Sequence, residues 1–285
     1  MEMIPAPSAM QLNASQLYAL SKKALVQNEI KKAVDGCRIL NTEFPQFFEG
    51  WWLAGCIHLR LKKPEAGLIS TTRALSLRPN EPTVLIQRVE CLSLLGRQKD
   101  VRENLQILAA QKCDSAALHE KIAMMLSVEQ MHSEAVKHYK SAIAYEPNNS
   151  MLHYNLAAAY RFIGELDKCE DSLNACLALN NLDSEAQGMR SSLRRQSIDS
   201  NHLEELLEAY SDPNIDDQAK SGICYALAKE YDDLNDPENS FNYLKTGSDI
   251  RRGAMSYDVS SDEKIIEHII HTFDESYFLR DALGH

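Results

Sequence analysis

A period of 34 residues runs through the first two thirds of this 285-residue chain. Counting back from Ser150 in steps of 34 leads, without a gap, to Ala116, Pro82, Phe48 and Ala14. Each unit carries two apolar stripes at helical spacing with a short turn between them. Two short helices cannot bury both stripes alone, so each unit must pack against others of its kind. The period therefore predicts a stack of antiparallel helix hairpins.

The unit that shows the pattern most clearly is 150–183. Large and small side chains alternate along its two stripes: His153, Leu156, Tyr160, Ile163, Leu173 and Leu177 are large, and Ala157, Gly164, Cys169 and Cys176 are small. Small residues let two helices approach closely, and glycine suits the turn between them. We expect helices over about 150–162 and 165–179.

Composition supports an all-helical chain. The sequence is 44% apolar, has few glycines and prolines, and shows no alternating strand pattern. No stretch reaches the roughly 18 uncharged apolar residues of a membrane span. The N-terminus also lacks the basic-then-apolar layout of a signal peptide. We therefore expect a cytoplasmic protein without a membrane partner.

The seven cysteines are scattered and form no CxxC pair, so they are expected to be reduced core thiols rather than disulfides or metal ligands. His268 and His271 lie three residues apart on a predicted helix, but two histidines without a third ligand are weak grounds for a metal site. No nucleophile, base and orienting group come together in the pattern. The sequence predicts no catalytic residue, no metal and no cofactor in this chain.

The net charge of −11 is unevenly distributed. Residues 1–199 carry 23 Lys and Arg against 22 Asp and Glu, whereas residues 200–285 carry 7 against 19. Nucleic-acid binding depends on clustered basic residues, so a neutral repeat region with an acidic end argues against a nucleic-acid partner. The acidic end is either a solvated surface or a face that docks on a basic partner.

Nine segments follow from the period and from where it fails. Residues 1–13 are expected to be a disordered leader with two prolines. Five units follow at 14–47, 48–81, 82–115, 116–149 and 150–183, then an irregular helical joint at 184–220 and a further hairpin at 221–254. Residues 255–285 are expected to hold a linker and a helix over about 261–278, with Ser260 and Glu263 spaced as a capping box.

The spacing within the units resembles the tetratricopeptide repeat (TPR) family. A unit has a large residue at its fourth position, small at the eighth, large at the eleventh, alanine near the twentieth and twenty-seventh, and proline at the thirty-second. In 48–81, Trp51, Gly55, His58, Ala74 and Pro79 follow this pattern, and 82–115 departs from it most. The resemblance implies an all-α, right-handed superhelical solenoid of antiparallel helix hairpins.

The resemblance also implies a concave groove lined by the first helix of each unit. The candidate partner-binding residues are Tyr18, Lys22, Trp52, Glu90, Glu120, Tyr154, Asn155 and Arg161. TPR domains that bind chaperones carry a basic, asparagine-containing clamp over three consecutive repeats. The nearest candidates here, Lys22, Lys121 and Asn155, fall in the first, fourth and fifth units, so a co-chaperone is not expected. Tyr18 and Trp52 either bury a peptide in the groove or pack between repeats.

The segment 225–278 resembles the region that joins the repeats to the catalytic domain in bacterial TPR-containing sulfotransferases. The matching residues are Ala226 to Lys229, Asp233, Leu234, Asp236, Ser240, Phe241, Arg251, Arg252, Tyr257, Asp258, Thr272 and Phe273. In that family a loop in the catalytic domain binds the donor 3′-phosphoadenosine-5′-phosphosulfate (PAPS). No such loop occurs in this sequence, so PAPS would belong to a domain outside this chain.

Two main functions remain open at this stage. The first is a non-catalytic interaction and substrate-positioning module of a sulfotransferase-like protein, and the second is a stand-alone TPR adaptor that scaffolds protein complexes. A protein or peptide in the groove is the expected partner of either. Self-association, through the groove or an open end of the solenoid, is a third alternative.

Overall fold

The computed structural model describes residues 12–275 and residue 277. This described part contains fifteen α-helices and no β-strand, so the predicted all-α fold is confirmed. The chain falls into two units, residues 1–179 and 180–285, which we call the N-terminal and C-terminal units. Most of the expected leader lies outside the described residues.

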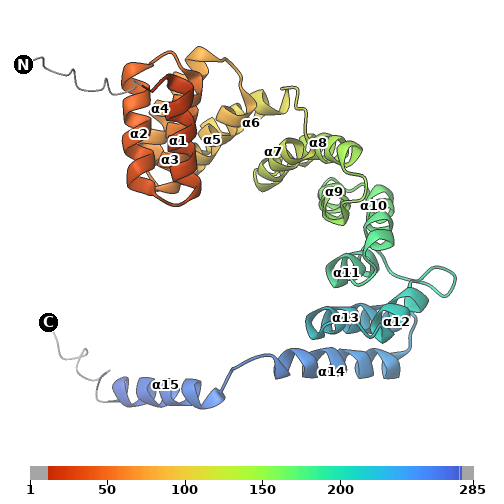
Figure 1. Cartoon of the computed structure of the whole chain (residues 1–285). Helices are drawn as coiled ribbons and strands as arrows, with labels where there is room; N and C mark the ends of the chain where they lie inside the picture. The colour runs from red at the N-terminus through yellow and green to blue at the C-terminus, as the bar shows by residue number, and fades with distance from the viewer. Residues whose placement is uncertain (1–11, 276, 278–285) are drawn as a thin grey trace, which may run out of the picture. The chain divides into compact units, whose positions relative to one another are not determined.

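The N-terminal unit is a row of five antiparallel helix hairpins (Figure 1). Their first helices begin at residues 14, 48, 82, 116 and 150, so the 34-residue period is also the period of the structure. In order, the helices are α1 (Ala14–Val26), α2 (Ile30–Glu43), α3 (Phe48–Arg60), α4 (Pro64–Leu77), α5 (Pro82–Leu94), α6 (Gln98–Ala109), α7 (Ala116–Val128), α8 (His132–Tyr145), α9 (Ser150–Phe162) and α10 (Leu166–Leu179). Each helix packs on its neighbours in sequence.

The second helix of every hairpin buries the same two positions. At the twentieth and twenty-seventh positions of the units stand Ala33 and Leu40, Gly67 and Ala74, Val101 and Leu108, Ala135 and Ala142, and Cys169 and Cys176, all buried. They lie seven residues apart and so share one face of the helix. Repetition of this buried face is what makes the five hairpins stack alike. In contrast, Ile163 is exposed at the end of α9, outside the stripe to which the sequence pattern assigned it.

The turn inside every hairpin contains one residue with left-handed backbone. These residues, at the fifteenth position of each unit, are Asn28, Lys62, Gly96, Gln130 and Gly164, with φ of 62°, 53°, 68°, 60° and 79°. Such a residue ends a helix by turning the chain back, and glycine adopts it without steric cost. The first helix of each unit therefore ends at the same place even where the residue is Lys or Gln.

Side chains at the fourth position tie consecutive hairpins together. The Trp51 indole Nε1–H donates to the Pro45 carbonyl at 2.9 Å, and His153 Nε2 lies 2.9 Å from the Pro147 carbonyl. In both pairs the proline ends one unit and the ring begins the next. The large fourth residue and the proline that mark the repeat pattern are thus partners in space.

The third hairpin is the least regular, as the sequence indicated. Its second helix, α6, has 12 residues where the other second helices have 14, and six residues (110–115) connect it to α7. The His138 ring joins the two sides of this connection, since its Nε2 lies 3.2 Å from the Ala109 carbonyl and its Nδ1 lies 3.0 Å from His119 Nδ1. Burial lowers the pKa of His138, so the ring is held neutral.

The C-terminal unit is built around one long hairpin. Its helices are α11 (Ser184–Ser192), α12 (Leu203–Ser211), α13 (Asp217–Asp233), α14 (Pro237–Gly253) and α15 (Val259–Thr272). α13 and α14 form the hairpin, and both α11 and α12 pack on α13. The hairpin begins at Asp217, inside the segment expected to be an irregular joint, because Asp216 caps α13 by accepting a hydrogen bond from Ala219 N.

A buried carboxylate organises the joint between α11 and α12. Glu230 is fully buried and accepts hydrogen bonds from Ser191 Oγ at 2.5 Å and from the His202 backbone N–H at 2.7 Å. The His202 ring Nδ1 lies 3.0 Å from the same carboxylate. Burial acts to raise the pKa of Glu230, but these hydrogen bonds outweigh it and the pKa is lowered.

The predicted capping box of the last helix is wrong. α15 begins at Val259, and Asp258 caps it by accepting hydrogen bonds from Ser260 N at 3.0 Å and Ser260 Oγ at 2.7 Å. Asp258 forms the cap in place of Ser260 because its carboxylate reaches both donors. α15 ends at Thr272, and the predicted end at Phe278 lies outside the described residues.

Candidate interaction groove

The predicted N-terminal end of the groove is an aromatic cluster. Lys22 Nζ lies 5.7 Å from the centre of the Tyr18 ring and 6.0 Å from that of Trp52. Tyr18 also meets Phe47 edge to face, with ring centres 6.1 Å apart. Both Tyr18 and Trp52 are partly buried against the core that contains Leu53. Much of their surface is therefore used to pack consecutive hairpins, and the ammonium group covers part of the rest.

The middle of the row of first helices carries paired charges. Glu90 on α5 and Lys121 on α7 form an ion pair, with Nζ and Oε1 2.8 Å apart, and both side chains are partly exposed. Glu120, also predicted to line the groove, is half-buried beside Tyr139. A lysine already paired with a carboxylate is less available to a ligand carboxylate.

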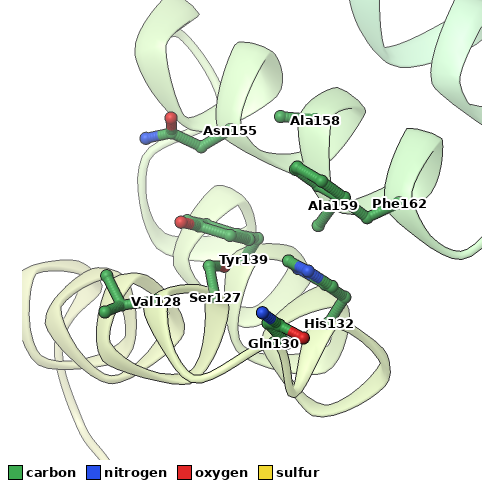
Figure 2. Close-up of a pocket in the computed structure, with 9 residues that line it drawn as sticks. All are labelled: Ser127, Val128, Gln130, His132, Tyr139, Asn155, Ala158, Ala159 and Phe162. Atoms are coloured by element: carbon green, nitrogen blue, oxygen red, sulfur yellow. The ribbon is translucent and has the colours of Figure 1, made fainter.

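A pocket of about 690 Å³ opens at the C-terminal end of the row, among α7, α8 and α9 (Figure 2). Its lining residues are Ser127, Val128, Gln130, His132, Tyr139, Asn155, Ala158, Ala159 and Phe162. Figure 2 shows Asn155 and Ala158 on the α9 side and Ser127 and Val128 on the α7 side, with Tyr139 between them. The pocket is thus bounded by two consecutive hairpins.

The pocket combines apolar walls with one unsatisfied polar atom. The His132 and Phe162 rings stack in parallel, with centres 4.3 Å apart and planes 3° apart. The Nδ1 atom of His132 is buried and has no hydrogen-bond partner among the described residues. Tyr139 is itself buried, which raises its pKa and keeps the phenol neutral. A neutral ligand with an apolar group and one hydrogen-bonding group therefore matches the site.

An exposed apolar row recurs with the period of the hairpins, and two of its members, Val128 and Phe162, line this pocket. It consists of the thirteenth residue of the units, none of which was among the residues expected to line the groove. Its members Val26, Leu94, Val128 and Phe162 are 75%, 59%, 79% and 72% exposed, and Arg60 takes the place in the second hairpin. The same 34-residue period could have identified them, because these apolar residues recur at a position that the hairpin core does not use.

The eight predicted groove residues fall into separate places. Tyr18, Lys22 and Trp52 are close together, Glu90 is paired with Lys121, and Asn155 lines the pocket. Tyr154 is half-buried on α9 and Arg161 is exposed near its end. Of the eight residues, only Asn155 lines the pocket, and its main walls were not predicted.

Other groups considered in the sequence lie apart from this groove or inside the core. Burial raises the pKa of Cys37 to about 12 and that of Cys56 to about 11, which keeps both as thiols. His268 and His271 are exposed on α15. Over residues 12–275, no group of three or more side chains is placed to hold a metal ion, and no helix is long and apolar enough to cross a membrane.

Comparison with known proteins agrees with the architecture. The tetratricopeptide repeat family model matches residues 129–193. No curated protein matches the chain. Among solved structures, the chain is similar to PilF of Pseudomonas aeruginosa, at 10% identity and a TM-score of 0.53, over 80% of this chain and 96% of that one. It is also similar to YrrB, described as a TPR protein with an unusual peptide-binding site, at 11% identity and a TM-score of 0.50, over 73% and 97%.

These comparisons define the class of the fold. The chain has the all-α fold of tetratricopeptide repeat proteins, and residues 129–193 also carry the sequence pattern of that family. The predicted fold is confirmed. The identities are low, so the likeness to PilF and YrrB is a likeness of fold alone.

Proposed function

We propose that this chain is a non-catalytic protein-interaction module whose N-terminal unit binds an apolar segment of a partner protein. The observation that carries the proposal is the apolar row of Val26, Leu94, Val128 and Phe162, which ends at the pocket beside His132. Exposed apolar side chains that recur in register along a stack of hairpins are typical of an interaction surface. The peptide-binding description of YrrB, which shares the fold, supports the same kind of ligand.

The pocket suggests how the partner is held. An apolar side chain of the partner enters between Val128 and Phe162, and a polar group beside it forms a hydrogen bond with His132 Nδ1 or with Asn155. Full burial of one such side chain is worth about 1.5–3 kcal/mol. The row then holds further apolar residues of the same segment. We assign no catalytic residue and no cofactor to this chain.

A finer proposal concerns the protein in which this module works. The described part of the sulfotransferase-like segment falls on the second half of α13, on α14 and on α15. Its resemblance to the region beside the catalytic domain of that family supports a role in positioning the acceptor for a PAPS-dependent sulfotransferase domain outside this chain. PAPS would then bind that domain, and the protein would act in the cytoplasm. Neither solved structure described above is a sulfotransferase. The alternative is a stand-alone TPR adaptor that scaffolds protein complexes.

The mass of the endogenous protein distinguishes these two. A species larger than 32.1 kDa by a domain of about 200 residues, which also binds PAPS, supports the sulfotransferase module. A species of 32.1 kDa would support the stand-alone TPR adaptor. Both measurements use the protein from its natural source and need no knowledge of the acceptor.

The groove itself is tested with selected peptides. Peptides are selected from a displayed random library on the full chain, and the dissociation constant of the tightest is measured by fluorescence anisotropy. Phe162→Ala is expected to weaken binding about tenfold, because it removes one wall of the pocket. The control is Ile69→Ala, an equally exposed apolar residue on α4 outside the row. Equal affinities for the parent chain and Phe162→Ala would rule out the groove.

A further inference from the structure

The last described helix presents an apolar face that nothing in the described part of the chain covers. None of the residues of α15 is buried. Its exposed large apolar residues are Ile265, Ile266, Ile269, Ile270 and Phe273. At 100° per residue these five span an arc of about 140°. Asp262, in the first turn, falls within this arc, and the other charged residues of the helix lie outside it. An arc this wide is broader than the seam of a two-stranded coiled coil and matches the face of a helix hairpin.

A second uncovered stripe lies on α14. Phe241 and Leu244 are exposed and lie three residues apart on α14, with Arg252 on the same side of the helix. Met255, just beyond the end of the helix, is exposed as well. The opposite side of α14 packs on α13, where Gly247 is buried and its carbonyl accepts a hydrogen bond from Ser221 Oγ at 2.8 Å. α14 therefore has one face fixed in the hairpin and one left exposed.

The connection between α14 and α15 keeps these two surfaces of one chain apart. The Arg252 guanidinium lies 5.3 Å from the centre of the Tyr257 ring, and Tyr257 Oη donates to Asp262 Oδ2 at 2.6 Å. With the Asp258 cap, these contacts join the end of α14 to the first turn of α15. Figure 1 shows α15 continuing beyond the end of α14 rather than lying beside it. The chain thus holds its own α15 away from its own α14.

We propose that a second copy of this chain covers both surfaces, with α15 of each copy lying antiparallel along the exposed stripe of α14 of the other. A single interface with two-fold symmetry covers the exposed faces of α14 and α15 in both copies, because α15 of each copy packs on α14 of the other. The lengths match, because α14 and α15 have 17 and 14 residues, or about 25 Å and about 21 Å at 1.5 Å per residue.

Charge favours the antiparallel arrangement. Asp262 lies in the first turn of α15, with Glu263 directly after it, and Arg251 and Arg252 lie in the last turn of α14. Antiparallel packing brings these acidic and basic turns of different copies together. The parallel arrangement would place the acidic turn beside Glu238 at the start of α14 instead. The direction of the pairing therefore follows from the charges.

The number of apolar side chains is sufficient for a dimer. Each copy contributes nine large exposed apolar residues: Phe241, Leu244, Met255, Val259, Ile265, Ile266, Ile269, Ile270 and Phe273. A stable interface involves about 20–30 residues from each side around a core that is mainly apolar. Nine apolar residues per copy supply such a core, with the charged residues of α14 and α15 as its rim.

The oligomeric state of the full chain tests the proposal. Sedimentation velocity from about 1 to about 100 µM should show the parent chain passing from 32.1 kDa toward twice that mass. Phe241→Glu on α14, or Ile266→Glu on α15, should raise the dimer dissociation constant at least about 100-fold. The matched control is Ile198→Glu, a highly exposed residue outside both stripes, which should dimerise like the parent. All these residues are exposed, so circular dichroism should show unchanged helix content.

A mixing experiment distinguishes a dimer in which α15 packs on α14 of the other copy from dimers with other helix pairings. When Phe241→Glu and Ile266→Glu chains are mixed, the intact α15 of the first can still cover the intact α14 of the second. The mixture should therefore dimerise more tightly than either variant alone. If mixing gives no increase in dimer affinity, the proposed packing of α15 on α14 is wrong, and pairing of α15 with α15 takes its place. A parent chain that stays monomeric up to about 100 µM would overturn the dimer itself, and would indicate a different occupant or the chain's own α14.

Discussion

The two units of this protein use different means to define their structure. In the N-terminal unit the interior is mainly apolar and repeats, with the same positions buried in hairpin after hairpin. In the C-terminal unit, Arg190 and Glu230 are buried as well, and Glu230 holds the chain between α11 and α12. Of the described residues, no Asp, Glu, Lys or Arg is buried in the N-terminal unit. Repetition makes buried charges unnecessary, and where the repeat fails a buried carboxylate fixes the chain instead.

The largest expected effect on the difference between the two units comes from substitution of Glu230. Glu230→Ala should lower the free energy of unfolding of the C-terminal unit by about 3–5 kcal/mol, because it leaves His202 N and Ser191 Oγ buried without their acceptor. Urea unfolding followed by circular dichroism measures the loss. Both tryptophans, Trp51 and Trp52, lie in the N-terminal unit, so the fluorescence transition should stay in place. A loss below about 1 kcal/mol would show that the carboxylate is not an anchor.

The mirror-image variant is Leu53→Ala in the N-terminal unit. Leu53 is fully buried in the cluster that packs Trp52, so truncation should cost about 2–5 kcal/mol through lost burial and the cavity left behind. Here the tryptophan fluorescence transition should move to lower urea, while the unfolding of α13 and α14, followed by hydrogen exchange, should not. A shift of both together would mean that the two units unfold as one.

The pH dependence of stability should also differ between the two units. The lowered pKa of Glu230 means that its contribution to stability is complete above the ordinary glutamate range and is lost as the pH falls through the lowered value. In Glu230→Gln this part of the pH dependence should disappear. The measurement is the difference between parent and variant in the free energy of unfolding of the C-terminal unit from about pH 7 to about pH 3. A constant difference over that range would contradict the lowered pKa.

The smallest effects on stability are expected at the hairpin turns of the N-terminal unit, where a residue with left-handed backbone recurs every 34 residues. Lys62→Gly should stabilise that unit by about 0.5–1 kcal/mol, since φ at this residue is 53° and glycine adopts it without strain. Gly164→Ala should destabilise it by about 1 kcal/mol, because φ is 79° although the space around a Cβ is empty. Thermal unfolding of the two variants gives both signs. Equal signs would show that backbone conformation does not decide stability here.

The sequence predicted the repeated part well because every constraint in it occurs five times. A helix start such as Pro82 or Ser150 follows from the period even where the local residues depart from the pattern. The cap of α15 was assigned wrongly because two capping residues, Asp258 and Ser260, compete within three positions. Glu230 was missed because its partners lie 28 and 39 residues away, and no local pattern relates a carboxylate to them.

The groove was only partly predictable for a similar reason. The period identifies which residues recur. It does not say how much of each recurring side chain is buried by the neighbouring hairpins. The sequence therefore left open whether Tyr18 and Trp52 contact a ligand or pack between repeats, and the structure shows both rings partly buried against the core. The stacked pair of His132 and Phe162 comes from different units and different positions within them. A pairing of this kind appears only when the hairpins are placed side by side.

The ties between hairpins also bear on how such a chain can change in evolution. The link from Trp51 to Pro45 joins one unit only to the unit before it, and the helices of the N-terminal unit pack only on near neighbours. Duplication or loss of a whole 34-residue unit would therefore leave every remaining tie intact. The number of exposed apolar positions in the row is then set by the number of units, which a single recombination event in the gene can raise or lower by one.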